Sequence, residues 1–172
     1  MPTALEFTEQ QIRENIARAI GDVFKTMLNR PAQPVPADAA GGVPAARPGS
    51  RQVVGTVGFA GEANGAVYIY FNEAFAKKCT GGMLGLSDQE IEEMGSEPVN
   101  DAVGELSNMI VGSFKNGLND AGFPCKLSIP STLSGTDFTI SPWPHGSARR
   151  HAYAFESLGQ FIVADVILKL GN

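Results

Sequence analysis

The first apolar pattern along the chain predicts an amphipathic helix at about residues 8–29. Large apolar side chains recur there every three or four positions, which is the spacing of one helical face. The pattern follows a Thr-x-x-Gln capping box that begins at Thr8, and Pro31 ends it. The apolar positions are Ile12, Ile16, Ala17, Ile20, Val23, Phe24 and Leu28.

Residues 31–50 break this pattern. The segment contains five prolines and three glycines, and its only large apolar residues are two valines. Such a composition cannot supply a buried face, so it predicts an extended linker or insertion that forms no helix or strand.

Two strands are predicted next, at residues 53–59 and 67–71, because valine, isoleucine and aromatic residues are concentrated there. Asn64-Gly65 lies between them, and both residue types tolerate the positive φ angles of a tight turn. We therefore expect a β-hairpin that turns at Asn64-Gly65.

Three further helix starts can be recognised from their capping residues. Asn72 is placed to cap a helix that includes Cys79, and Ser87 begins a second capping box with Glu90. Ser96 is placed to cap a long helix that ends near Gly122.

The C-terminal part of the chain reads as strands. Short strands are expected at 126–129 and 138–141, then a loop over 141–150, then two strands near 151–157 and 160–169 that meet at Leu158-Gly159. Helices and strands therefore interleave in one domain, 1–172, of the α/β (α+β) class.

Charge and composition narrow the function. The formal net charge is −5, which disfavours binding to nucleic acid or to an anionic membrane. The longest apolar stretch is short and is interrupted by Asp165, and the N-terminus lacks the pattern of a signal peptide. Cys79 and Cys125 have neither disulfide-framework nor zinc spacing, so we expect buried free thiols in a cytoplasmic protein that binds no metal.

The long helix carries the residues of greatest chemical interest. Its apolar residues gather on one side, whereas Asp101, Glu105, Asn108 and Gly112 fall in a row on nearly the opposite side. A solvated polar face is the ordinary explanation for such a row. Asparagine and glycine are nevertheless poor helix formers, and each glycine costs about 1 kcal/mol. This composition favours a face that another molecule approaches.

The same helix resembles the signature of the CheC/CheX/FliY phosphatases: Asp or Ser, three residues, Glu, two residues, Asn, and a proline about twenty-two residues later. Here the residues are Asp101, Glu105, Asn108 and Pro130, with twenty-one residues between the last two. An N-terminal helix ending in Thr-Met-Leu-Asn, an Asn-Gly pair and a Met-Leu-Gly before the helix add to the resemblance. The signature occurs once, because the first helix has Glu14 but Ala17 in place of asparagine, and this favours the CheX type.

The resemblance implies a mostly antiparallel sheet with two long helices packed on it, and a homodimer formed by joining sheets. It further implies hydrolysis of the aspartyl phosphate of a CheY-like receiver domain. Asn108 would then orient the attacking water, and Glu105 would contact the receiver's lysine. Asp101 and Gly112 would belong to the docking face, and Mg²⁺ would be supplied by the receiver.

Two other interpretations stay open. The domain could bind a receiver without catalysis, as an adaptor or phosphate sink, or it could be a scaffold with exposed strands. His145 and His151, next to Arg149 and Arg150, could also form a site for an acidic partner, although surface polarity is the simpler account.

Overall fold

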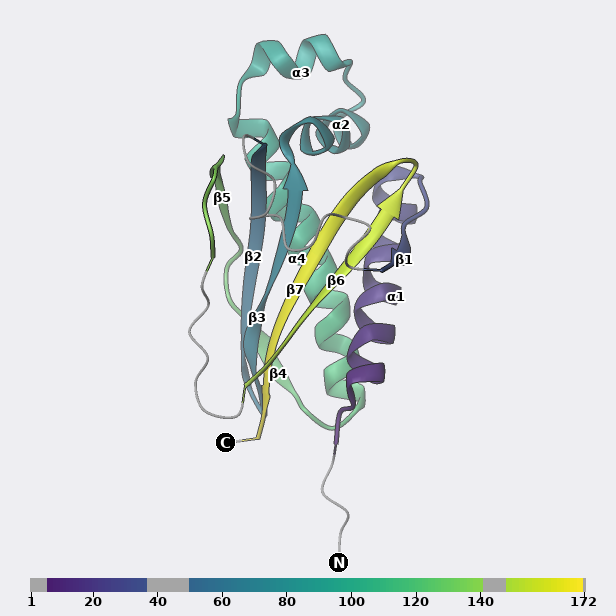
Figure 1. Cartoon of the computed structure of the whole chain (residues 1–172), viewed down its shortest axis with the longest axis vertical. Coiled ribbons are helices and arrows are strands. Elements are labelled where there is room, and N and C mark those ends of the chain that lie inside the picture. Colours follow the sequence, from purple (N-terminus) through teal and green to yellow (C-terminus); the bar gives the residue numbers. More distant parts are fainter. Residues whose placement is uncertain (1–5, 37–49, 141–147, 172) are drawn as a thin grey trace, which may run out of the picture.

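One antiparallel sheet organises the chain, and the long helices α1 and α4 lie along the same face of it (Figure 1). This computed structural model describes residues 6–36, 50–140 and 148–171. The helices are α1 (Glu9–Leu28), α2 (Glu73–Leu84), α3 (Asp88–Met94) and α4 (Glu97–Asp120). The strands are β1 (Gln33–Val35), β2 (Arg51–Gly61), β3 (Ala63–Asn72), β4 (Cys125–Leu127), β5 (Ser131–Thr136), β6 (Arg149–Ser157) and β7 (Gln160–Leu170).

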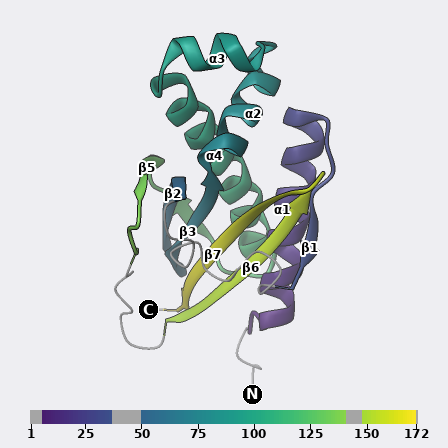
Figure 2. The same cartoon turned by 45° about the horizontal axis from the view of Figure 1, so that its top comes forward.

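The strand order of the seven-stranded sheet is β1-β6-β7-β3-β2-β4, with β5 also paired to β2. Every pairing is antiparallel. The predicted α/β (α+β) class, with two long helices on a mostly antiparallel sheet, is confirmed. The turned view places β5 and β1 at opposite sides of the molecule, so the two edges of the sheet are far apart (Figure 2).

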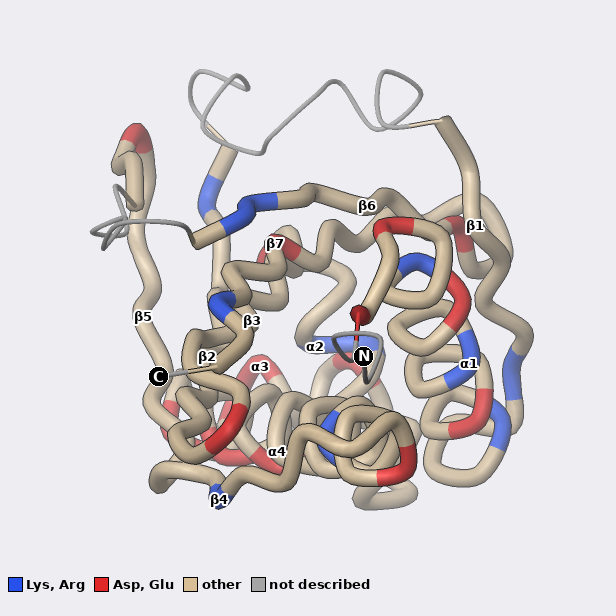
Figure 3. Tube along the Cα trace, turned by 90° about the horizontal axis from the view of Figure 1, so that it is seen from below, with Lys and Arg blue, Asp and Glu red and all other residues tan. Residues whose placement is uncertain are grey.

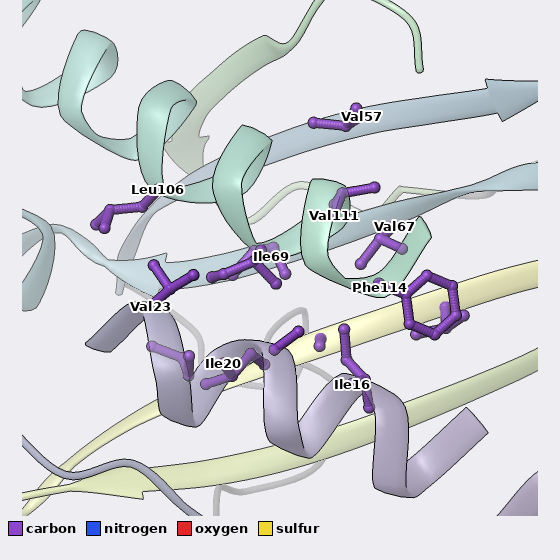
Figure 4. Packing of buried hydrophobic residues seen from close by; sticks show 14 of the residues in the cluster. Ile16, Ile20, Val23, Val57, Val67, Ile69, Leu106, Val111 and Phe114 are labelled. Carbon is purple, nitrogen blue, oxygen red and sulfur yellow. The ribbon is translucent and has the colours of Figure 1, made fainter. Parts of the chain in front are cut away.

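The core lies between the sheet and the two long helices (Figure 4). Ile16 and Ile20 of α1 and Leu106 and Phe114 of α4 are fully buried, and they meet Ile69 and its neighbours on the strands. The apolar faces expected from the helical spacing are therefore the faces that pack. Charged residues of both signs are spread over α1, away from this core (Figure 3).

Capping explains most of the helix starts. The Thr8 and Ser87 capping boxes both form, and the Asn72 side chain accepts a hydrogen bond from the Phe75 backbone N–H at 2.8 Å. The expected cap at Ser96 is wrong. Its backbone is already helical (φ −84°, ψ −22°), so its side chain makes no capping hydrogen bond. Gly122, with φ 92°, follows the end of α4 as expected.

The prediction that residues 31–50 form no element is wrong for Gln33–Val35, which are strand β1. These residues pair with β6, Gln33 opposite Glu156. An edge strand needs only backbone hydrogen bonds on one side, and it can therefore tolerate Pro34. The rest of the predicted linker, 37–49, lies outside the described residues.

The hairpin prediction is right about the two strands and wrong about the turn. Phe59 pairs with Gly65, so Gly65 lies in β3, and Asn64 instead closes the loop by donating to Gly61 O at 2.9 Å. A two-residue turn at Asn64-Gly65 would place odd-numbered residues opposite even-numbered ones. The apolar residues of β2 and β3 would then face opposite sides of the sheet, so burial selects the observed register.

The C-terminal hairpin is confirmed, with Leu158 (φ 48°) and Gly159 (φ 83°) at its turn. The strand expected at 138–141 is wrong, because the strand is β5, at Ser131–Thr136. The serines, threonines and glycine of β5 are typical of a loop. They can nevertheless form a strand at the edge of a sheet. Phe138 and Ile140 instead pack against a second apolar cluster that contains Val54 and Tyr70. Most of the predicted loop 141–150, with Trp143, is not described, but Arg149 and Arg150 belong to β6.

The sheet also contains an ion pair between the half-exposed Arg150 and the buried Asp165. Asp165 is completely buried and accepts hydrogen bonds from Arg150, the shortest at 2.7 Å. Burial, followed by the nearby Asp165 carboxylate, raises the pKa of Tyr70 to about 12. Burial likewise raises the pKa of the Cys79 thiol to about 12, and both cysteines are buried and free, as expected.

The position of Gly65 generates a prediction about stability. A Cβ added there would lie 1.9 Å from the Ile167 carbonyl oxygen, so Gly65→Ala should separate β3 from β7 and destabilise the fold by about 3 kcal/mol or more. Gly82→Ala is the control, because its Cβ would meet only Leu28 at 3.7 Å and should stabilise α2 by up to about 1 kcal/mol. Urea unfolding measures both. Equal stability of the two variants would contradict the register.

Candidate functional site

The exposed face of α4 is the candidate site. Asp101 and Glu105 are exposed, and Asn108 and Gly112 are partly exposed. The opposite face of the helix is buried against the sheet, α1 and α2. The structure therefore brings the four sequence-predicted residues together on one accessible side of a single helix.

The polar side chains of this face are not used in the fold. Within the part of the chain that the structure describes, no hydrogen bond or ion pair involves the side chains of Asp101, Glu105 or Asn108. Asn15 of α1 shows the contrast. It is buried, and its amide donates to Phe114 O at 2.8 Å while it accepts from Arg18 at 2.6 Å. Asn15 joins two helices, whereas Asn108 keeps its donors and acceptor available.

A bulge between β4 and β5 lies beside the same turns of α4. Both short strands pair with β2, but the register shifts by one residue between Phe59–Leu127 and Thr56–Ser131. Pro130 sits in the interruption, where its missing N–H is not needed by the sheet. Its neighbour Ile129 is 86% exposed, the highest exposure among the large apolar residues of the described chain.

Two distances show that the bulge lies alongside the helix. A Cβ built on Gly104 would lie 3.6 Å from Thr132, and one built on Gly112 would lie 3.9 Å from Leu127. The chain from Leu127 to Thr132 therefore runs antiparallel to the turns that carry Glu105 and Asn108. The proline of the sequence pattern and its Glu–Asn pair, far apart in the sequence, form neighbouring parts of one surface.

The same two distances show that packing within the described chain does not explain the glycines at positions 104 and 112. Both are ordinary van der Waals contacts, so no described neighbour requires glycine at position 104 or 112. Gly104 is buried under Thr132, whereas Gly112 is partly exposed. At Gly112 the missing side chain leaves room at the protein surface.

The other candidate residues lie elsewhere. His151 of β6 is 3.7 Å from Glu9 and stacks on Tyr153, with ring centroids 6.2 Å apart. His145 is outside the described residues. His151 belongs to the β1–β6 side of the sheet, opposite to β5, so it is not part of the α4 surface.

The described residues include neither a candidate metal site nor a membrane-spanning helix. No group of three or more His, Cys, Asp and Glu side chains is placed to hold a metal ion. No described helix is both long and apolar enough to span a membrane.

The family model described as "Chemotaxis phosphatase CheX" matches residues 53–155. The chain belongs to the CheX family.

Solved structures agree with this fold. The CheX protein of Desulfovibrio desulfuricans is 26% identical, with a TM-score of 0.71 over 92% of this chain and 99% of its own. CheX from Vibrio vulnificus is 24% identical, with a TM-score of 0.70 over 95% and 99%. CheX in a CheX–CheY–BeF3–Mg²⁺ complex from Borrelia burgdorferi is 19% identical, with a TM-score of 0.64 over 92% and 97%. No curated protein sequence matches the chain.

The bulge is a part of the surface that the sequence pattern did not predict. Ile129-Pro130 carried one usable signal, because a proline between two short apolar segments indicates an edge or a bulge. Nothing in the sequence places that bulge beside α4.

Proposed function

We propose that this protein hydrolyses the aspartyl phosphate of a CheY-like receiver domain. The observation that carries the proposal is the Glu105–Asn108 pair, whose side chains make no hydrogen bond or ion pair within the described chain, on a helix whose opposite face is buried. Membership of the CheX family supports it, as does the fold likeness to a CheX protein solved with CheY.

In this proposal Asn108 positions the attacking water in line with the phosphorus. A carboxamide is not basic at neutral pH, so its contribution is orientation by hydrogen bonds rather than proton removal. The BeF3 of the related complex is a beryllium fluoride group, which can stand in for a phosphoryl group. The Mg²⁺ would belong to the receiver, where it would offset the developing negative charge.

Glu105, one turn earlier, would bind the receiver's active-site lysine and so set the register of the helix. Exposed carboxylates hold such a partner weakly until both are desolvated at an interface. Asp101 would extend the acidic side of the docking face. Gly112 would allow the receiver's backbone close to the helix, since among the described residues only Leu127, at 3.9 Å, lies near a Cβ built there.

A non-catalytic receiver-binding adaptor or phosphate sink is the alternative. It shares the docking face and differs only in the role of Asn108, because binding alone needs no positioned water. The homodimer and the cytoplasmic location expected from the resemblance stay predictions.

Asn108→Ala should lower the receiver dephosphorylation rate by about 10²–10³, the scale for loss of one preorganised polar group. Binding of the receiver should change little. The measurement is the decay of labelled phosphoryl receiver with Mg²⁺, with and without the protein. Asn116→Ala, an exposed asparagine two turns further along α4, is the matched control and should keep the wild-type rate. A wild-type protein that binds receivers yet accelerates none would favour the adaptor.

Glu105→Ala should weaken receiver binding and the rate together, because the lysine contact is lost. We expect a loss of affinity of about tenfold, equivalent to about 1.4 kcal/mol. Titration of the receiver in its BeF3-bound form measures this without turnover. Asp120→Ala removes an exposed carboxylate from the last turn of the same helix and should leave binding intact. Unchanged affinity in Glu105→Ala would remove this residue from the docking face.

Gly112→Ala should stabilise the fold but weaken docking of the receiver. The added methyl group fits within this chain, so the free energy of unfolding should rise by up to about 1 kcal/mol. It would occupy the space proposed for the receiver, so KM should rise by about tenfold. Gly21→Ala in α1 is the control: its added methyl group would meet only the Ala32 carbonyl oxygen at 3.8 Å, so a similar stability gain is expected while KM stays unchanged. Equal KM values in both variants would argue against close approach at Gly112.

A further inference from the structure

The helix α4 approaches the sheet very closely between Ser107 and Gly55 of β2. A Cβ built on Gly55 would lie 1.9 Å from Ser107 Oγ, 2.7 Å from Ser107 Cβ and 3.1 Å from the Val103 carbonyl oxygen. No real Cβ tolerates the first two distances. The helix can therefore lie at its observed depth only because position 55 has no side chain and position 107 has a small one.

A second contact lies at the same level of the sheet. Thr132 of β5 is the register partner of Gly55, and it is the residue that contacts Gly104. Gly55 and Thr132 thus support α4 from two adjacent strands. We call Gly55, Gly104, Ser107 and Thr132 the helix seat.

The helix seat is adjacent to the candidate site in both sequence and space. Gly104 precedes Glu105, and Ser107 precedes Asn108. Residues one position apart on a helix point about 100° away from each other, so the seat holds one side of the turn while the site residues project from another. Any shift of this turn against β2 moves Glu105 and Asn108 relative to the bulge at Ile129-Pro130.

Ser107 is present in the seat for its size rather than for its hydroxyl group. It is completely buried, and among the residues that the structure describes its Oγ has no hydrogen-bond partner. An unpaired buried hydroxyl is unfavourable, so hydrogen bonding does not account for the serine. The close approach to Gly55 does, because only a small residue fits there.

We propose that Gly55 and Ser107 are positioning residues for the phosphatase reaction: their close contact sets the height of α4 above the sheet and so the reach of Asn108 toward the receiver. The inference rests on the proposed function. Positioning of a reacting group is sensitive to displacement, and a shift of about 1 Å can change a rate by about a hundredfold. Packed interiors transmit such a shift instead of absorbing it.

The test is a mutant cycle read by kcat at saturating phosphoryl receiver. Gly55→Ala should raise α4 and lower kcat at least tenfold. Gly55→Ala combined with Ser107→Gly removes both atoms that the new Cβ meets below 3 Å and should restore kcat to within about threefold of wild type.

Gly117→Ala is the matched control for general strain in α4. A Cβ there would lie 2.3 Å from the Asn15 side-chain amide, so the change strains the α1–α4 contact, more than two turns beyond Asn108. It should lower stability while leaving kcat unchanged. If Gly55→Ala does not fold, Ser107→Val enlarges the same contact from the helix side and should give the same loss of kcat.

Three outcomes would overturn the inference: wild-type kcat in Gly55→Ala, no recovery in the double variant, or an equal loss of kcat in Gly117→Ala. Each of them requires an active wild-type protein. A wild-type protein that accelerates no receiver would instead overturn the proposed function, and with it this inference, so the two failures are distinguishable.

Discussion

The burial of one side of α4 against the sheet is the constraint on which the rest of the structure depends. Val103, Leu106 and Ile110 are completely buried there, which leaves the opposite side free to carry polar groups without a cost to folding. The close contact between Ser107 and Gly55 fixes the height of the helix. The polar face of α4 is therefore preorganised, because the buried side of the helix, and not the polar residues themselves, sets its position.

The two long helices show how differently the same fold can use similar residues. Asn15 of α1 is buried between the helices and shares its amide with Phe114 and Arg18, so it stabilises the α1–α4 contact. Asn108 of α4 makes no such contact within the described chain and faces outward. With Ala17 three positions after Glu14, α1 also lacks the asparagine of the pattern. The structure therefore presents one Glu–Asn surface of this kind, on α4.

The surface around Asn108 combines polar side chains of a helix with an apolar bulge at the edge of the sheet. Carboxylates and a carboxamide come from α4, while the bulge supplies Pro130 and the exposed apolar Ile129. Protein interfaces commonly pair a few polar anchors with an apolar side chain that excludes water. A receiver that docks across both parts would meet its phosphoryl chemistry at Asn108 and its apolar contact at the bulge.

Features that depend on neighbours a few residues away could be predicted from the sequence. Helical spacing and the caps at Thr8, Asn72 and Ser87 located three helices, and the row from Asp101 to Gly112 followed from the helical period alone. The two apolar strands β2 and β3 and the turn at Leu158-Gly159 were also found, since their patterns are local.

Only the tertiary structure decided the features that depend on distant partners. β1 and β5 are held by backbone pairing at sheet edges, which leaves almost no mark on side-chain composition. The hairpin turn was set by the need to bury the apolar residues of both strands on one face, and this overruled the local preference of Asn64-Gly65. The bulge came to lie beside Asn108, and Gly55 beneath Ser107, because packing joins residues that are far apart in the chain.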